Sequence, residues 1–291
     1  MKGRRAVSIR VFSFALFSFF GAACVAVATL HRATPSKQLD ISYEFKESEI
    51  TLHEPLVLIF KVHNGLDQPV ALDMGENNIQ SFEFALISPR GQTIQGRHQR
   101  SMGLSTTTGN LPVEPGGDFK LELILNQWFE LGALGKYLLT ARLNTAIDTG
   151  GMSTAPHPAQ SIPFEIKPRD VNRLRKVCAE LVSRVENAGG VEAEREPALE
   201  LSYVNDPIAA PYLAEVLARH MLNYDLAIQG FERIGNDDAV EALLSALDDE
   251  YGDIAVLARR ALTRMQDRIS NPNLRETVRR ALEKEPPPSS Q

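Results

Sequence analysis

Residues 230–244 read GFERIGNDDAVEALL, and this stretch decides the fold of the C-terminal part of the chain. On each side of Gly235, apolar residues recur at the spacing of one face of an α-helix. Gly235 fits the position just after a helix end, where a left-handed backbone costs least in glycine. Asp237 is expected to cap the second helix, because its carboxylate can accept hydrogen bonds from free N–H groups of the first turn. The stretch therefore predicts two helices joined by a tight turn.

The same pattern occurs twice, at an offset of 31 residues. The pair Asn205-Asp206 matches Asn236-Asp237, and ten further positions match as apolar or small residues. The first copy has Ile208, Ala209, Tyr212, Leu213, Val216, Leu226, Ala227, Gly230, Phe231 and Ile234, and the second has Ala239, Val240, Leu243, Leu244, Leu247, Leu257, Ala258, Ala261, Leu262 and Met265. Each set follows one helix face, so two consecutive helical hairpins are expected.

Less regular copies flank these two hairpins. A helix is expected over Pro197–Val204, another over Asp170–Val185, and a last one opening at Asn271-Pro272. About three hairpins result, which is close to the minimum for a stacked core. The last residues, 284–291, contain three prolines and are expected to be a disordered tail.

The stretch 230–244 resembles the junction of bacterial HEAT-like repeats, whose pattern is ALGxIGdxxAvpaLl. This resemblance implies a short all-α solenoid over residues 169–283 that binds a protein partner through the face lined by the second helix of each hairpin. The outward positions on those helices are Gln229, Glu232, Arg233, Arg259, Arg260 and Arg264. Two interpretations stay open for them: a solvated charged face, or a recognition patch for an acidic partner.

Upstream of the solenoid, residues 39–168 predict an all-β module. Ile41, Tyr43 and Phe45 alternate with polar neighbours, as a half-buried strand requires. Six further runs follow and are separated by turn residues: Leu56–Val62, Val70–Leu72, Phe82–Leu86, Leu121–Leu125, Tyr137–Leu143 and Ile162–Ile166. About seven strands at this spacing predict a β-sandwich, with a long loop over residues 91–110.

Residues 135–141, GKYLLTA, resemble the PG-x-Y strand opening of bacterial Ig-like and fibronectin-like modules. The resemblance implies an Ig-like sandwich in which the Tyr137 hydroxyl bonds back to the chain at a corner, and the preceding Trp128-Phe129 pair agrees with it. Leu134 stands where that pattern has proline, which leaves the exact turn open. The Ig disulfide is absent, because Cys24 and Cys178 are the only cysteines.

The N-terminal 28 residues predict export. Lys2, Arg4, Arg5 and Arg10 precede an uncharged apolar run over residues 11–30, the pattern of a signal peptide. Cleavage is expected after Ala28, followed by a linker over residues 29–38. Retention as an N-terminal membrane anchor and lipidation at Cys24 stay open as alternatives. In each case the rest of the chain lies outside the cytoplasm.

Charge and composition exclude several classes of partner and site. The net charge of −6 comes from the helical part, which carries 16 basic and 22 acidic residues from Arg169 onward, and this argues against nucleic acid. Lone Cys178 predicts a small buried hydrophobe rather than a zinc ligand. His53 and His63 have no third ligand nearby in sequence. The acidic run over residues 248–253 lacks calcium-loop spacing, so we expect a helix-helix turn capped by Asp253.

No enzyme motif is present: the chain has no GxSxG, HExxH, CxxC or glycine-rich phosphate loop. We therefore expect no catalytic residue, no metal ligand and no cofactor. The sequence favours an exported protein-interaction scaffold of a bacterial cell envelope. The alternative is an accessory or lyase-like HEAT module that supports an enzyme or handles a small molecule or pigment, since HEAT-like repeats also occur in bilin-lyase proteins.

Overall fold

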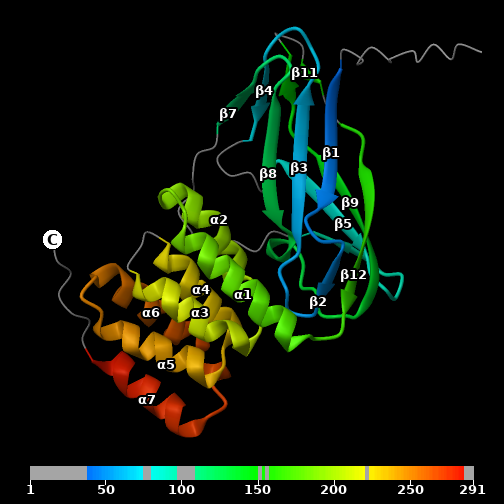
Figure 1. Cartoon of the computed structure of the whole chain (residues 1–291). Helices are drawn as coiled ribbons and strands as arrows, with labels where there is room; N and C mark the ends of the chain where they lie inside the picture. The colour runs from blue at the N-terminus through cyan, green and yellow to red at the C-terminus, as the bar shows by residue number, and fades with distance from the viewer. Residues whose placement is uncertain are drawn as a thin grey trace, which may run out of the picture. The chain divides into compact units, whose positions relative to one another are not determined.

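The computed structural model describes residues 38–74, 80–96, 109–149, 153–154, 157–219 and 223–284. The predicted signal segment, Cys24, the tail after residue 284 and the middle of the predicted long loop, 97–108, lie outside the described residues. The β module and the helical module both belong to one unit, Lys37–Gln291. The predicted order, sheets first and helices second, is confirmed (Figure 1).

The N-terminal module is a β-sandwich of two main layers. One layer has the order β1-β3-β8, and the other has the order β2-β12-β9-β5-β6. A small third sheet, β11-β10-β4-β7, lies at the end away from the helices (Figure 1). The strands are β1 (Leu39–Phe45), β2 (Glu49–Thr51), β3 (Val57–Asn64), β4 (Val70–Asp73), β5 (Phe82–Ile87), β6 (Thr93–Gln95), β7 (Asn110–Val113), β8 (Asp118–Ile124), β9 (Gly135–Leu143), β10 (Ile147–Asp148), β11 (Ser153–Thr154) and β12 (Gln160–Lys167).

All seven predicted strands are present, because alternation marks the side chains that the two layers bury between them. Phe60 of β3 is fully buried and meets the Phe82 ring of β5 edge-on at a centroid distance of 5.0 Å. Phe45 of β1 reaches Phe164 of β12 at 5.0 Å. These contacts join the two layers into one apolar core.

The predicted loop over residues 91–110 is wrong at both ends. Strand β6 lies inside it and pairs with β5, and Asn110 already begins β7. Both strands have only three or four residues, which is too short for alternation to be visible in the sequence. Leu125, predicted in a strand, opens a 3-10 turn instead.

The C-terminal module is helical throughout. Its helices are α1 (Val171–Glu186), α2 (Val191–Ser202), α3 (Ala210–Ala218), α4 (Tyr224–Ile234), α5 (Asp237–Ser245), α6 (Gly252–Met265) and α7 (Pro272–Glu283). The predicted ends hold at α1, where Asp170 accepts hydrogen bonds from the first turn, and at α7, where Asn271 does so. Gly235 ends α4 with the predicted left-handed backbone, at φ 63°.

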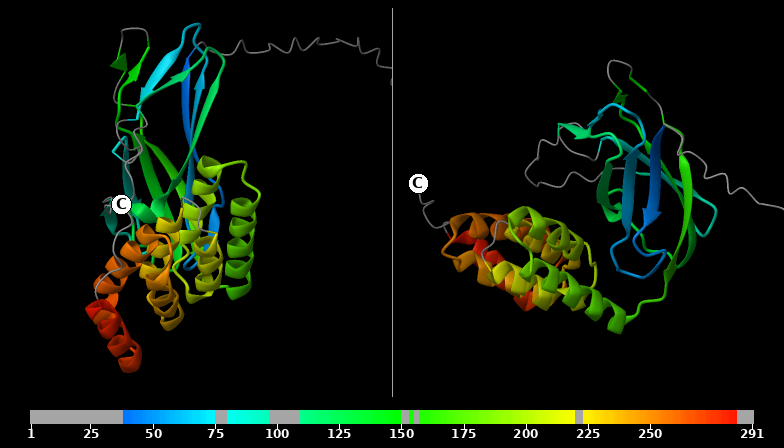
Figure 2. Two further views of the ribbon diagram at one scale, coloured as in Figure 1. Left: turned by 90° about the vertical axis from the view of Figure 1, so that its left-hand side faces the viewer. Right: turned by 45° about the horizontal axis from the view of Figure 1, so that its top comes forward.

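The helices stack as hairpins in two layers. Helices α1, α3, α5 and α7 contact one another in sequence, and so do α2, α4 and α6 (Figures 1 and 2). The ten matched apolar or small positions of the 31-residue repeat are all buried or half-buried. Gly230 lies where α4 meets α3, because a Cβ there would come within 2.7 Å of Leu213 Cδ1. The repeat therefore encodes the surface on which neighbouring helices pack.

Two predicted caps are corrected by one residue or more. The cap of α5 is Asn236, whose side chain accepts from the N–H of Ala239 at 3.1 Å, and Asp237 is the first helical residue. Asp253 lies in the first turn of α6, after a helix start at Gly252. Both acids still lie where a carboxylate favours the helix dipole.

Cys178 is fully buried in the helical core, as expected of a small hydrophobe, and burial raises the pKa of its thiol to about 12. Within the part of the chain that the structure describes, no helix combines the length and the hydropathy of a membrane span.

Candidate functional site: the junction of the two modules

The chain passes from β12 into α1 through a short connection that is tied to the sandwich. The hydroxyl of Thr51 in β2 donates to the carbonyl of Pro168 at 2.6 Å and accepts from the N–H of Asp170 at 2.7 Å. The N–H of Leu52 donates to the carbonyl of Lys167 at 3.0 Å. The start of α1 is thereby fixed against the edge of the sheet.

Two ion pairs lie at this junction. Arg173 of α1 makes two bonds, at 2.6 and 3.0 Å, to Glu54 in the β2–β3 turn. Arg169 makes two bonds, at 2.6 and 2.9 Å, to Asp206, which also accepts from the N–H of Ile208. Asp206 and Glu54 are both buried, so these carboxylates depend on their arginines for compensation. The bonds from Arg169 hold the pKa of Asp206 below its usual range.

An apolar contact lies beside the ion pairs. Val57 of β3 and Ile124 of β8 pack against Tyr203, the residue that ends α2. His53 has a φ of 76°, and its carbonyl accepts from the N–H of Asn205 at 3.1 Å. His53 is the third residue of the turn that the N–H of Glu54 closes on the carbonyl of Thr51, and its carbonyl also joins this turn to the helical module.

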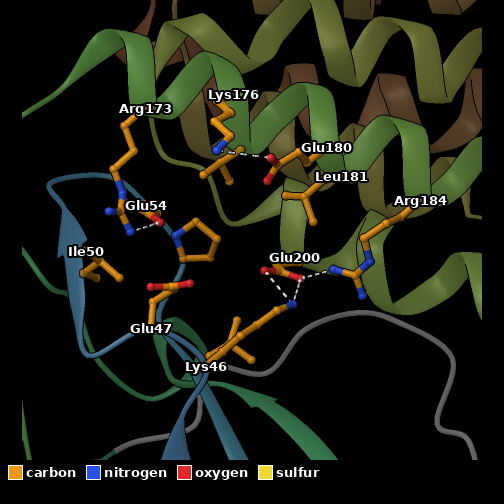
Figure 3. A pocket seen from close by; sticks show the side chains of 13 residues that line it. Lys46, Glu47, Ile50, Glu54, Arg173, Lys176, Glu180, Leu181, Arg184 and Glu200 are labelled. Carbon is orange, nitrogen blue, oxygen red and sulfur yellow. Dashed lines mark hydrogen bonds and ion pairs between the residues drawn. The ribbon is translucent and has the colours of Figure 1, made fainter.

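A cleft of about 310 Å³ opens between α1 and the β1–β3 segment (Figure 3). Its apolar lining comes from Ile50, Pro55, Val57, Val177 and Leu181. Its charged lining is mixed in sign, and comprises Lys46, Glu47, Glu54, Arg173, Lys176, Glu180, Arg184 and Glu200. Figure 3 shows most of these charges in pairs: Arg173 with Glu54, Lys176 with Glu180 along α1, and Glu200 with both Lys46 and Arg184.

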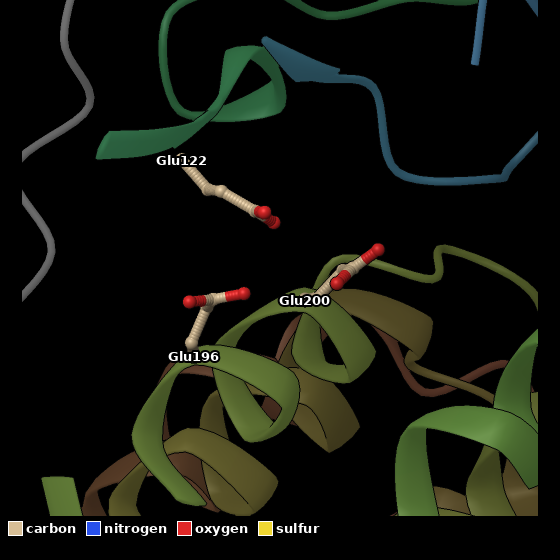
Figure 4. Close-up of side chains that lie close together, drawn as sticks. All are labelled: Glu122, Glu196 and Glu200. Carbon is tan, nitrogen blue, oxygen red and sulfur yellow. The ribbon is translucent and has the colours of Figure 1, made fainter. Parts of the chain in front are cut away.

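Three carboxylates meet at the junction (Figure 4). Glu122 projects from β8, whereas Glu196 and Glu200 lie one turn apart on α2, and their nearest oxygens are within 4.8 Å of one another. Three cations surround them. Lys46 lies 3.3 Å from Glu122 and 3.1 Å from Glu200.

The other two cations complete a closed network. Lys120 lies 2.6 Å from Glu122, and Arg184 lies 2.7 Å from Glu196 and 2.9 Å from Glu200. Three carboxylates are thus matched by three cations, a donor set that does not fit a resident metal ion, which prefers carboxylates without competing ammonium groups. The arrangement is an ion-pair network that joins four elements of the two modules.

The three carboxylates do not share one environment. Burial opposes ionisation of Glu122, but hydrogen bonds from Lys120 and Glu196 and the charge of Lys46 lower its pKa to about 2. The pKa of Glu196 is raised by burial and by its side-chain hydrogen bond to Glu122. A hydrogen bond between two carboxyl groups requires one proton, so this pair titrates as a unit.

The two histidines considered in the sequence lie apart from this network. His53 lines a second cleft, of about 360 Å³, on the other side of the β2–β3 turn. His63 of β3 lies with Nδ1 2.8 Å from Asp118 of β8, on the outer face of the sandwich. The structure does not bring them together.

Most side chains of the predicted second-helix surface bond to other residues of the same chain. Arg233 donates to the carbonyl of Ser202 at 3.0 Å and lies over the Tyr203 ring at 3.8 Å, so it faces the junction rather than solvent. Glu232 accepts two bonds from Arg264, at 2.7 and 2.6 Å. These contacts link each hairpin to the next.

The remaining three positions differ among themselves. Gln229 bonds along α4 to Asp225 at 3.4 Å, and Arg259 donates to the carbonyl of Leu282 at 2.9 Å, where α7 ends. Arg260 is exposed and makes no hydrogen bond or ion pair with the described residues. Arg260 is thus the one predicted position that stays available to a partner.

Sequence reasoning missed the junction. Its members come from the turn after β1, from β2, β3 and β8, from the β2–β3 turn and from the helical module, and their pairing depends on how the two modules pack. The one available signal was the spacing of Glu196 and Glu200, which places two carboxylates on one face of a helix.

No family model matches the chain, and no curated protein matches it. Among solved structures, the chain is similar to the sporulation control protein Spo0M from Bacillus subtilis, with 10% identity over 49% of this chain and 54% of that chain and a TM-score of 0.26. It is also similar to the CARDB domain of the PF1109 protein from Pyrococcus furiosus, in complex with di-metal ions, with 9% identity, coverage of 45% and 88%, and a TM-score of 0.24. A third is the alkylpurine DNA glycosylase AlkC from Pseudomonas fluorescens, bound to DNA with an abasic site analog, with 13% identity, coverage of 44% and 30%, and a TM-score of 0.23. Likenesses at these TM-scores carry no argument about this chain's function.

Proposed function

We propose that this chain is an exported, non-enzymatic binding protein of a bacterial cell envelope, in which a short HEAT-type solenoid holds a protein partner. The observation that supports this most is the two-layer stack of hairpins built on a 31-residue repeat. Stacked hairpins expose a long continuous surface, and proteins of this architecture use it for binding. The sandwich packs against the stack at the junction.

The surface that fits a partner best is the outer face of α6. Val256, Arg260 and Thr263 recur at helical spacing on this face and are all exposed, with Val256 at 40%. A solvent-exposed valine beside an unpaired arginine combines an apolar contact with a donor for carboxylates. We therefore propose that the partner is acidic where it meets α6.

The charged groups of the junction support the non-enzymatic side of the proposal. An active site needs polar groups that converge on a substrate, with reactive atoms left free. In the junction the carboxylates of Glu54, Glu200 and Asp206 are each bound to an arginine or a lysine. Their bonds stabilise the packing of the modules instead.

The test is affinity capture from a cell-envelope extract of the source organism, with purified full-length chain as bait. Arg260→Glu and Val256→Asp change the proposed surface. Arg175→Glu is the matched control, because Arg175 is an exposed arginine of α1 that pairs with no described residue. Arg259 and Arg264 are left intact, since they hold α7 and α4 in place.

We expect one protein to be captured by the wild type and by Arg175→Glu, and to be reduced about tenfold or more with Arg260→Glu, the size of a well-placed charge reversal. Equal capture by all baits would show that the partner binds at a surface other than α6. A pigment or other small molecule that co-purifies with the chain, with no protein captured, would favour the accessory or lyase-like alternative instead.

A further inference from the structure

We propose that the junction contains a proton-dependent latch, in which one proton shared by Glu122 of β8 and Glu196 of α2 holds the helical module against the sandwich. This inference goes beyond the proposed function and does not depend on the identity of a partner. It concerns how the two modules respond to the acidity of their surroundings.

The geometry supplies the latch. Glu122 and Glu196 belong to different modules, and their carboxyl groups face each other across the junction (Figure 4). Each is also paired with a cation: Lys120 lies 2.6 Å from Glu122, and Arg184 lies 2.7 Å from Glu196. The structure places an oxygen of Glu122 within 4.8 Å of an oxygen of Glu196. With a shared proton this contact is a hydrogen bond, and without the proton it is a like-charge contact.

Charged groups from several segments surround the pair, whereas β3 places the uncharged Ile59 opposite Glu122. Glu196 is about half exposed, so water screens its interactions, and the latch adjusts the junction rather than deciding whether the chain folds. The charged groups that face the pair are Lys46 after β1, Lys120 on β8, Arg184 on α1 and Glu200 on α2, and Glu44 on β1 acts on Lys120.

The direction of the pH response follows from the two carboxyls taken together. The pKa of Glu196 is raised in the folded chain, so its contribution is complete below the ordinary glutamate pKa and is lost as the pH rises through the raised value. The pKa of Glu122 is lowered to about 2, so its contribution is complete above the ordinary value and is lost as the pH falls toward 2. The two stabilising contributions are present together near the ordinary glutamate pKa of about 4.3. The junction is therefore tightest in mild acid and loosens toward neutral pH.

The latch also acts on the cleft of Figure 3. Lys46, Arg184 and Glu200 belong both to the ion-pair network and to the cleft lining. When Glu196 gains or loses its proton, the charge balance that holds these three side chains changes. The cleft mouth is thus connected to the protonation state of the pair.

The experiment is hydrogen exchange with mass spectrometry on the purified full-length chain, from pH 4.5 to pH 7.5, corrected for the chemical exchange rate at each pH. Peptides from α2 and β8 report on the junction, and peptides from α5 serve as an internal reference. Glu196→Gln keeps the side-chain shape and supplies an N–H donor to Glu122 at every pH. Glu241→Gln, an exposed glutamate of α5 with no partner among the described residues, is the matched control.

We expect exchange in α2 and β8 of the wild type to speed up about threefold between pH 4.5 and pH 7.5 relative to α5, the size of one screened charge interaction. Glu196→Gln should show the slow rate throughout, and Glu241→Gln should follow the wild type. The proposal is overturned if the wild type shows no such pH dependence, or if Glu196→Gln retains it. If circular dichroism shows that Glu196→Gln is unfolded, Glu122→Gln takes its place and must flatten the pH dependence in the same way.

Discussion

The hydroxyl of Tyr137 donates to the carbonyl of Ala133 at 2.8 Å, four residues earlier in the chain. This bond closes the corner before β9, and the Tyr137 ring stacks on Phe164 of β12 at a centroid distance of 5.0 Å. One side chain therefore fixes both the turn into β9 and the packing of β9 against its neighbour. The resemblance of residues 135–141 to an Ig-like strand opening implied a bond from this hydroxyl back to the chain, and the structure identifies Ala133 as the acceptor.

Removing that hydroxyl should weaken the sandwich. We expect Tyr137→Phe to lower the free energy of unfolding by about 1 kcal/mol, because the ring still packs but the half-buried carbonyl of Ala133 loses its donor. Urea unfolding followed by circular dichroism measures the change. Tyr212→Phe on α3 is the matched control, since its hydroxyl bonds to no described residue. If both variants unfold at the wild-type midpoint, the corner bond does not contribute to stability.

His53 marks the limit of prediction at this scale. Its left-handed backbone is rare outside glycine. His53 is the third residue of a turn that the N–H of Glu54 closes by donating to the carbonyl of Thr51 at 3.0 Å, a position where several turn types take a positive φ. Because the sequence has no glycine or asparagine at this position, the turn left no clear signal, and the bond from the N–H of Asn205 to the His53 carbonyl could not be predicted locally.

At the scale of the element, the helix faces were predictable and the helix ends were less so. The 31-residue offset identified the buried positions, because packing against two neighbouring hairpins repeats the same requirement. The capping residue shifted from Asp206 in one hairpin to Asn236 in the next, which is one position earlier in the repeat. Either residue type can cap a helix, and Asp206 is further recruited by Arg169, so the local sequence alone does not determine the choice.

Gly230 should tolerate no side chain, although it lies inside a helix. In Gly230→Ala the new Cβ would come within 2.9 Å of both Leu213 methyl groups and 3.3 Å from the Ser202 backbone, in a fully buried core. We expect a net loss of about 1 kcal/mol, because overpacking outweighs the helix propensity gained. Thermal unfolding provides the measurement. Gly252→Ala, with open space around the new Cβ, should be neutral or stabilising, and a stabilised Gly230→Ala would contradict the close packing of α3 and α4.

At the scale of the whole molecule, the contacts of the junction could not be predicted from the sequence. Arg173 and Glu54 are 119 residues apart and belong to modules that each have a complete apolar core of their own. Periodicity predicts which side chains enter a core, but it says nothing about which charged side chains meet once two cores are placed side by side. The junction has mostly charged contacts, so it left no apolar pattern to follow.

Breaking the Arg173–Glu54 pair should destabilise the junction. Arg173→Ala leaves the carboxylate of Glu54, which is 6% exposed, with only the N–H of Thr51 as a donor. We expect a loss of about 2 kcal/mol, below the full cost of a broken buried pair because Arg173 itself is partly exposed. Urea unfolding of the full-length chain measures it. Arg175→Ala, two residues away and exposed, should leave the midpoint unchanged, and equal effects of the two variants would show that the pair contributes nothing specific.

The parallel pairing of β2 with β12 determines how the molecule bears mechanical load. The register joins Glu49 to Glu165, Ile50 to Ile166 and Thr51 to Lys167, and β12 leads directly into α1. When the N-terminal side of β1 is held and the helices are pulled, tension enters β2 at one end of this ladder and leaves β12 at the other. Its hydrogen bonds are then sheared together instead of being peeled apart one at a time. If the chain were held at its N-terminal side and pulled through its helices, β2 and β12 would separate only after all the hydrogen bonds between them had been strained together.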